Sequence, residues 1–243
     1  MKSAGPSSLI PEAYVLGLEG YGWLLLKGAK LTVYVGVCSL VIAICLGLVG
    51  ALCKLSRSGP IRFAANCYTT VIRGIPELVL ILLVYYGAPT LIQDILSLFG
   101  YDVYISLNPF AAGTATIGFI YGAFTTEVFR GAYLAVPKGQ IEAGRACGMN
   151  PALTFRRITL PQMMRFALPG LGNVWMVLIK ATALISVIQL PELMRNADIA
   201  ARATHKPFTF FFAASLIYLV ITIGSNIVQQ WAENRANRGV RRA

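Results

Sequence analysis

Long apolar stretches alternate with short polar segments along most of the chain. Residues 31–53, 103–126 and 207–232 contain no Asp, Glu, Lys or Arg. A helix needs about 20 residues to cross the hydrocarbon core of a bilayer, and each stretch reaches that length. We therefore predict a membrane-spanning helix in each of the three.

Two further apolar stretches contain ionisable residues. Residues 61–92 carry Arg73 and Glu77, and residues 166–191 carry Lys180. The alternative for such a stretch is a helix in the core of a soluble protein. A core helix of this length would carry a stripe of polar residues, and neither stretch has one. We interpret both as spans. The prediction is a single domain, 1–243, with spans at about 31–53, 61–88, 106–129, 166–191 and 207–231.

Composition supports lipid as the solvent of this chain. Apolar residues make up 56% of the sequence and charged residues 13%, against about 45–50% and about 25% in soluble proteins. The five cysteines show no C-x-x-C spacing, so we expect neither a disulfide framework nor a metal site. Residues 1–20 contain no apolar segment of the signal-peptide type, and no secretory signal is expected.

The net charge of +11 is unevenly placed. Fourteen of the 21 Lys and Arg residues fall in segments on one side of the predicted bundle. By the positive-inside rule this side faces the cytoplasm. The sequence therefore predicts a multi-pass membrane protein with its N-terminus outside and its C-terminus in the cytoplasm, and with the lipid bilayer, not nucleic acid, as the partner of its charge.

The predicted cytoplasmic segment 137–161 is too polar to span the membrane. Its glycine, asparagine and prolines stand at positions typical of helix ends, which a flexible linker would not need. Gly148 suits the C-terminal cap of one short helix. Asn150 and Pro151 provide an N-cap and a first-turn proline for a second helix, and Pro161 is expected to end it. We predict a helix-turn-helix beneath the bundle.

This segment resembles a known motif. Glu142, Ala143 and Gly144 are followed by Gly148 and by the run from Ile158 to Pro161, at the spacing of the E-A-A-x3-G-x9-I-x-L-P loop of binding-protein-dependent ABC importer permeases. Gly144 stands where that family usually has Ala. We expect this glycine to weaken the helix locally by up to about 1 kcal/mol.

The resemblance covers most of the chain and narrows to the polar amino-acid subfamily. Arg73-Gly74-Ile75-Pro76 is similar to its R-G-T-P element, and Lys180-x-Thr182-x-Leu184-x-Ser186 to its K-x-T-x-L-x-S stretch. The sequence is most similar to the first permease subunit of histidine and lysine-arginine-ornithine uptake systems and of arginine and opine systems.

The resemblance implies an all-α fold like that of type I ABC importer permeases, with about five transmembrane helices and a cytoplasmic coupling helix. It also implies three kinds of protein partner: a cytoplasmic ABC ATPase dimer, a second permease subunit, homologous or identical, and a periplasmic amino-acid-binding protein. The implied function is the channel subunit of an ATP-driven importer of amino acids, basic ones such as histidine, arginine, lysine, ornithine or opines. The implied location is a bacterial inner membrane, with the N-terminus in the periplasm and the C-terminus in the cytoplasm.

Within that family the E-A-A helix docks into a groove of the ATPase. The residues expected to couple this chain to an ATPase are Glu142, Ala143, Gly144, Arg145, Gly148, Arg156, Ile158, Leu160 and Pro161. The alternative is a solvated loop in which Glu142 only pairs with Lys138 or Arg145, which is worth a few tenths of a kcal/mol.

The ionisable residues inside the predicted spans are candidates for the solute pathway. An unpaired charge at the bilayer centre costs at least about 2.5 kcal/mol, so Lys180 must face protein or water. Two interpretations stay open: Lys180 lines the pathway, or it forms a structural pair with Glu77 or Glu127. The candidate pathway residues are Glu77, Lys180, Thr182 and Ser186.

No residue pattern indicates catalysis by this chain. His205 is the only histidine, and the sequence has neither a catalytic triad around it nor a Gly-rich loop that ends in Lys-Ser or Lys-Thr. We expect no catalytic residue, no metal and no cofactor, so that ATP is hydrolysed by another subunit. The alternative function is a secondary amino-acid transporter or channel without an ATPase, for which a docking helix at 137–161 would have no use.

Overall fold

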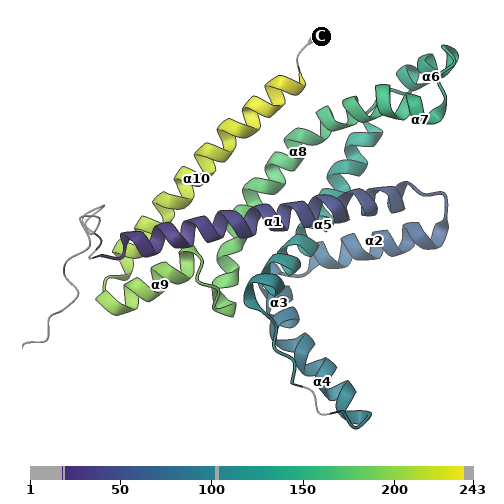
Figure 1. The fold of residues 1–243 in the computed structure, drawn as a ribbon. Coiled ribbons are helices and arrows are strands. Elements are labelled where there is room, and N and C mark those ends of the chain that lie inside the picture. The colour runs from purple at the N-terminus through teal and green to yellow at the C-terminus, as the bar shows by residue number, and fades with distance from the viewer. Residues whose placement is uncertain (1–17, 19, 102–103, 238–243) are drawn as a thin grey trace, which may run out of the picture.

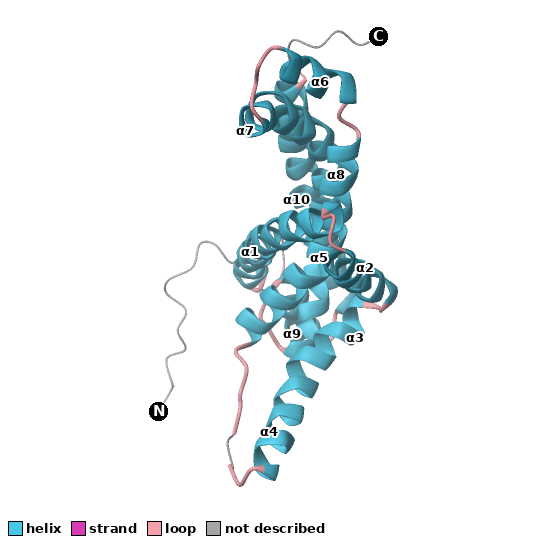
Figure 2. Ribbon diagram, turned by 90° about the vertical axis from the view of Figure 1, so that its right-hand side faces the viewer, coloured by secondary structure: helices cyan, strands magenta, loops and turns pink. Residues whose placement is uncertain are grey.

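The structure, a computed structural model, describes residues 18, 20–101 and 104–237, and these form helices joined by short loops. The expected all-α membrane fold is confirmed. The molecule is elongated, with α6 and α7 at one end and α4 at the other (Figure 2).

The helices follow in chain order: α1 Gly22–Leu55, α2 Gly59–Gly74, α3 Glu77–Leu82, α4 Ala88–Leu98, α5 Pro109–Leu134, α6 Lys138–Ala146, α7 Pro151–Thr154, α8 Leu160–Ala181, α9 Leu193–Thr204 and α10 Pro207–Ala236. Three tighter or wider turns connect them: the π-helical segments Leu83–Gly87 and Phe155–Thr159, and the 3₁₀ segment Thr182–Ile188.

Four helical stretches are long and apolar enough to cross a membrane: Gly22–Leu55, Glu77–Leu98, Pro151–Ile188 and Pro207–Ala236. The helix α5, of 26 residues, is a further long helix with more Gly, Ala and Thr. Its residues are buried along most of its length, from Ala112 to Ala132. Because other helices cover most of α5, it does not need the apolar surface that these four stretches carry.

The segment 61–88 is not the single helix that the sequence suggested. The helix α2 ends at Gly74, and Ile75 and Pro76 have extended backbone before α3 begins at Glu77. Proline disfavours helical backbone in the residue before it, which places the break at Ile75. The long apolar stretch therefore starts at Glu77, and α2 is a separate amphipathic helix.

The core lies where α5 crosses α1 and α8 (Figure 1). Gly118 and Gly122 of α5 allow a close approach, because a Cβ atom there would lie 2.6 Å from Ile42 Cβ and 2.9 Å from Leu46 Cβ of α1. Tyr121, between them, is buried. Small residues at this spacing let two membrane helices pack at short range. The α1–α5 pair is thus the scaffold from which α6 and α8 extend.

A second core cluster joins α9 to the first turns of α1 and α10. Its buried members are Leu18, Leu25, Leu193, Ala197, Ala200, Ala201, Phe210 and Ala214. This cluster holds α9 against the starts of α1 and α10, at a distance from α6 and α7.

Candidate functional site

The segment 137–161 forms two short helices, as expected. Gly148 has φ +80°, and the N–H groups of Gly148 and Met149 donate to the carbonyl oxygens of Arg145 and Gly144 at 2.9 and 3.1 Å. These two bonds are the Schellman motif that closes a helix at a glycine. The Asn150 side chain accepts from the Leu153 N–H at 2.8 Å, and α7 begins at Pro151. The predicted caps are confirmed.

The prediction that Pro161 ends the second helix is wrong. The π-helical segment Phe155–Thr159 joins α7 to α8, with the Leu160 N–H bonded to the Phe155 carbonyl. Proline in an α-helix lacks a donor and its ring clashes with the carbonyl four residues earlier, whereas a π turn widens the backbone at that point. The helical path therefore continues from Pro151 to Ile188.

The residues predicted to couple the chain to an ATPase present two different surfaces. Glu142, Ala143 and Arg145 are exposed on α6, as are Ala146 and Cys147 beside them. Gly144 alone is buried, against Ile158, Met149 and Thr154. Among the described residues, no ion pair includes Glu142, so the pairing with Lys138 or Arg145 is not formed. The outer face of α6 is a small, polar surface free to receive a partner.

The remaining predicted coupling residues lie in or beside the start of the Pro151–Ile188 path. Gly148, Arg156 and Pro161 are exposed, and Ile158 and Leu160 are half-buried. Ile158 contacts Gly144 and so fixes α6 to this path. The exposed residues of the motif thus form a surface without a partner within the chain, and Gly144 and Ile158 join α6 to the helix that follows.

A charge cluster joins the ends of α1 and α5 close to this segment. Glu127 accepts from Arg130 Nε at 3.0 Å, as the three-residue spacing suggests, and Lys54 of α1 forms a second ion pair with it. Because Glu127 is engaged with these two cations, it is not the partner of Lys180.

Glu77 lies at the helix break and lines a hollow of about 500 Å³. The Tyr121 hydroxyl donates to the Glu77 carboxylate at 2.9 Å. Arg73 lines the same hollow, with its guanidinium 5.1 Å from the centre of the Phe124 ring. Leu184, from the 3₁₀ segment, closes one wall. The hollow thus has a carboxylate, a guanidinium and an aromatic wall in reach of one small polar ligand.

The structure does not bring the four predicted pathway residues together. Lys180 is exposed and lines a different hollow, of about 300 Å³, with Tyr218 and Ser215 of α10. Thr182 is buried and donates to the Ile179 carbonyl at 2.7 Å. Ser186 is half-buried. Among the described residues Lys180 forms no ion pair, so its structural pairing with Glu77 is not formed either.

Sequence reasoning missed Glu192. This carboxylate is fully buried and caps α9 by accepting from the N–H groups of Met194 and Arg195 at 2.9 and 2.7 Å. Thr32 of α1 and Tyr218 of α10 also donate to it, each at 3.3 Å. Burial raises the pKa of Glu192, although these four donors oppose the shift. The only signal in the sequence was a lone acidic residue between apolar neighbours, Pro191 and Leu193.

The candidate sites lie within a region that known proteins share. Residues 43–238 match the family described as binding-protein-dependent transport system inner membrane component. The chain belongs to this family. The permease is thus the membrane component of a transport system that also requires a binding protein, and the predicted membership in this family of importer permeases is confirmed.

Curated relatives cover nearly the whole permease. The octopine transport system permease protein OccQ of Rhizobium radiobacter is 46% identical over 226 residues, 93% of this chain and 95% of that protein. The histidine/lysine/arginine/ornithine transport system permease protein HisQ of Salmonella typhimurium is 46% identical over 93% of this chain and 99% of its own length.

A solved structure shares the fold. The crystal structure of an amino acid ABC transporter with histidines superposes on the permease with a TM-score of 0.78 at 33% identity, and covers 90% of this chain and 97% of that one. The expected type I importer architecture therefore holds over nearly the whole length of the permease.

Proposed function

We propose that the permease is the channel-forming subunit of an ATP-driven importer of basic amino acids or opines. The proposal is supported by relatives whose names specify octopine or histidine, lysine, arginine and ornithine as transported solutes. The permease itself supplies no hydrolytic chemistry in this scheme, and ATP is hydrolysed by its partner.

The proposed complex contains two ATPase subunits in the cytoplasm, a second permease subunit, homologous or identical, and a periplasmic amino-acid-binding protein. In this arrangement α6, α7 and the end of α10 face the cytoplasm, and the N-terminus faces the periplasm. The concentration of Lys and Arg in the segments on the α6 side supports this orientation.

The exposed face of α6 is the observation that carries the proposal. Glu142, Ala143 and Arg145 point away from the permease, while Gly144 holds the opposite face against Ile158. A short helix with small residues at its centre and charges at its rim suits a groove in a partner, because the small side chains allow close approach and the charges set orientation. We assign this groove to the ATPase.

The continuous helix Pro151–Ile188 provides a route from α6 to the solute. Ile158 lies near one end of it and Leu184, in the wall of the Glu77 hollow, near the other. When ATP draws the two ATPase subunits together, the α6 helices of the two permease subunits approach each other. The helix Pro151–Ile188 of each subunit then rotates and moves Leu184 in the wall of the hollow. Docking of the binding protein outside would favour the same outward-facing state.

The coupling role is tested by charge reversal on α6. In membranes that contain the whole transporter, we expect tagged Glu142→Lys permease to lose its ATPase during purification in detergent, while the wild type retains it. The physical reason is that the substitution places a cation in a groove matched to a carboxylate.

The matched control is Asp94→Lys on α4, an exposed acidic residue at the opposite end of the molecule. This variant should keep the ATPase. Equal retention of the ATPase by the wild type and by Glu142→Lys would contradict the docking role and favour the transporter that works alone.

Glu77 is the group we propose to receive the cationic side chain of the solute. Replacement by Gln removes the charge, and because a hydrogen bond to a charged group contributes about 1.5–3 kcal/mol, kcat/KM for labelled arginine should fall by about tenfold or more. Uptake by vesicles containing the whole transporter measures this change.

Glu77→Asp, which keeps the charge, should retain more of the arginine uptake than Glu77→Gln. ATP hydrolysis by the complex serves as the folding control and should persist in both. Unchanged uptake in Glu77→Gln would contradict the role of this carboxylate, and faster uptake of a neutral or acidic amino acid by the wild type would contradict the proposed substrate class.

A further inference from the structure

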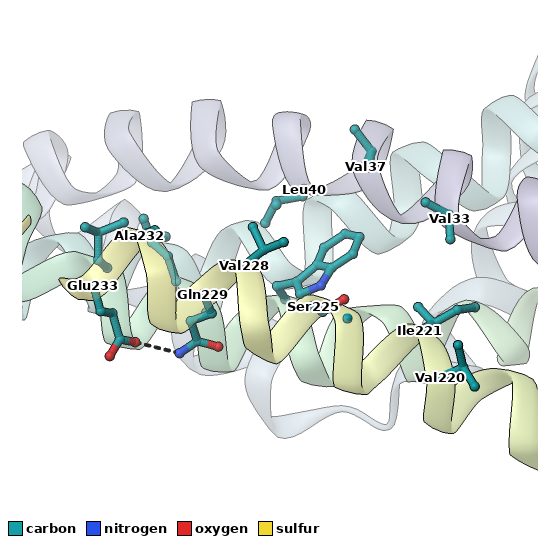
Figure 3. Close-up of a pocket in the computed structure, with 15 residues that line it drawn as sticks. Val33, Val37, Leu40, Val220, Ile221, Ser225, Val228, Gln229, Ala232 and Glu233 are labelled. Carbon is teal, nitrogen blue, oxygen red and sulfur yellow. Dashed lines mark hydrogen bonds between the residues drawn. The ribbon is translucent and has the colours of Figure 1, made fainter. Parts of the chain in front are cut away.

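An apolar groove runs along the outside of the permease between α1, α8 and α10 (Figure 3). It encloses about 630 Å³, and Leu40, Trp175 and Val228 are among its lining residues. A second hollow of about 550 Å³ lies along α1 from Trp23 to Val37 and reaches Ile221 in the middle of α10. Val33, Val37 and Ile221 line both, so the two hollows form one continuous groove.

The larger of the two hollows is by itself at least as long as one leaflet of a bilayer. On α10 the lining of the larger hollow runs from Val220 to Glu233, a distance of about 20 Å at the rise of 1.5 Å per helical residue. Half of a hydrocarbon core of about 30 Å is about 15 Å. The whole groove is longer than this, so one extended acyl chain fits inside it.

The two ends of the groove differ in charge. At one end Lys27 and Lys30 place their ammonium groups 5.7 and 5.6 Å from the centre of the Trp23 ring. Among the described residues neither lysine forms an ion pair. At the other end the Glu233 carboxylate accepts from Gln229 Nε2 at 2.8 Å (Figure 3). An anionic group is attracted to the first end and repelled from the second.

We propose that this groove is a binding site for one anionic phospholipid. Its phosphate and anionic headgroup lie beside Lys27 and Lys30, and one acyl chain lies along Val33, Val37 and Trp175 towards Gln229. Trp23 lies at the level of the headgroup, where Trp is enriched in membrane proteins. The pair of ammonium groups selects a net negative headgroup, because each Lys near the surface favours anionic lipid by about fivefold.

Two of the three tryptophans, Trp23 and Trp175, lie in the groove and report on its occupant. The test uses the full-length permease with Trp231→Phe, in vesicles of phosphatidylcholine that contain a few per cent of a lipid with brominated acyl chains. We expect brominated phosphatidylglycerol to quench the fluorescence several-fold more than brominated phosphatidylcholine at the same mole fraction.

The variant Lys27→Gln/Lys30→Gln should lose this preference. Arg57→Gln/Arg62→Gln, which removes two exposed charges around the α1–α2 turn, should keep it. A second measurement uses the whole transporter: phosphatidylglycerol extracted from the purified complex should fall in the lysine variant and not in the arginine variant.

Equal quenching by the two brominated lipids would overturn the proposal, since the groove would then only touch bulk bilayer. Absence of quenching would also overturn it, because a second permease subunit would then cover the groove. Unchanged phosphatidylglycerol in the purified lysine variant would locate the bound lipid elsewhere and contradict the assignment.

Discussion

At the level of single residues, Gly144 illustrates what the sequence could and could not predict. The sequence marked it as a departure from Ala and predicted a weaker helix. In the structure Gly144 faces Ile158, and a methyl group at this position would meet Ile158 Cδ1. The glycine is therefore matched to a residue 14 positions later on another helix. This pairing depends on the fold of the segment, which spacing alone does not contain.

The match predicts a coupled pair of substitutions. Gly139 lies on the same helix with open space around it, so Gly139→Ala should stabilise the permease by up to about 1 kcal/mol through helix propensity. Gly144→Ala should gain less, because Ile158 must move. The double variant Gly144→Ala/Ile158→Val relieves the clash. Its change in the free energy of unfolding should therefore be more stabilising, by about 0.5 kcal/mol or more, than the sum of the changes in the two single variants.

Thermal unfolding of the purified permease in detergent measures these differences. Additive effects of Gly144→Ala and Ile158→Val would contradict the contact between the two side chains.

At the level of helices, local signals were predicted better than long-range ones. Gly148 and Asn150 end and begin helices by local hydrogen bonds, and Pro151 suits a first helical turn because it has no N–H to satisfy. All three were predicted correctly. The prediction for Pro161 was wrong because the π-helical turn before it makes room for the proline ring. Burial of Thr159 and Met163 stabilises this turn. Glu192 was missed because its role depends on three helices that meet around it.

Glu192 predicts a dependence of stability on pH. Because burial raises its pKa in the folded protein, its contribution to stability is complete below the pKa of an unfolded glutamate. That contribution is lost as pH rises through the raised native value. The thermal midpoint of the permease should therefore fall as pH rises over this range. The substitution Glu192→Gln should make the thermal midpoint less dependent on pH.

Glu192→Ala should be less stable than Glu192→Gln at every pH. Loss of the cap costs about 1 kcal/mol, and the Thr32 and Tyr218 hydroxyls also lose their acceptor. A thermal midpoint with the same pH dependence in the wild type and in Glu192→Gln would contradict the raised pKa.

At the level of the whole molecule, hydropathy identified the helices that face lipid and said less about those that do not. The first and fifth predicted spans lie within long apolar helices, and the fourth does so except for its last three residues, which follow Ile188. The central helix α5 is less apolar because protein encloses it, and the second span was displaced by the break at Ile75. How Pro151–Ile188 connects α6 to the Glu77 hollow required the structure, since no local pattern specifies which helices meet.

The central claim is that α6 is the contact with a cytoplasmic ATPase, and Cys147 at its end offers a direct measurement. Cys147 is exposed, and the other four cysteines, Cys38, Cys45, Cys53 and Cys67, can be replaced by Ala. A photo-crosslinker attached to Cys147 in membranes with the whole transporter should form an adduct with the ATPase, and Glu142→Lys should diminish it. Reaction of Cys147 with an impermeant thiol reagent added to intact cells, or crosslinking only to lipid and to other permease chains, would contradict the account.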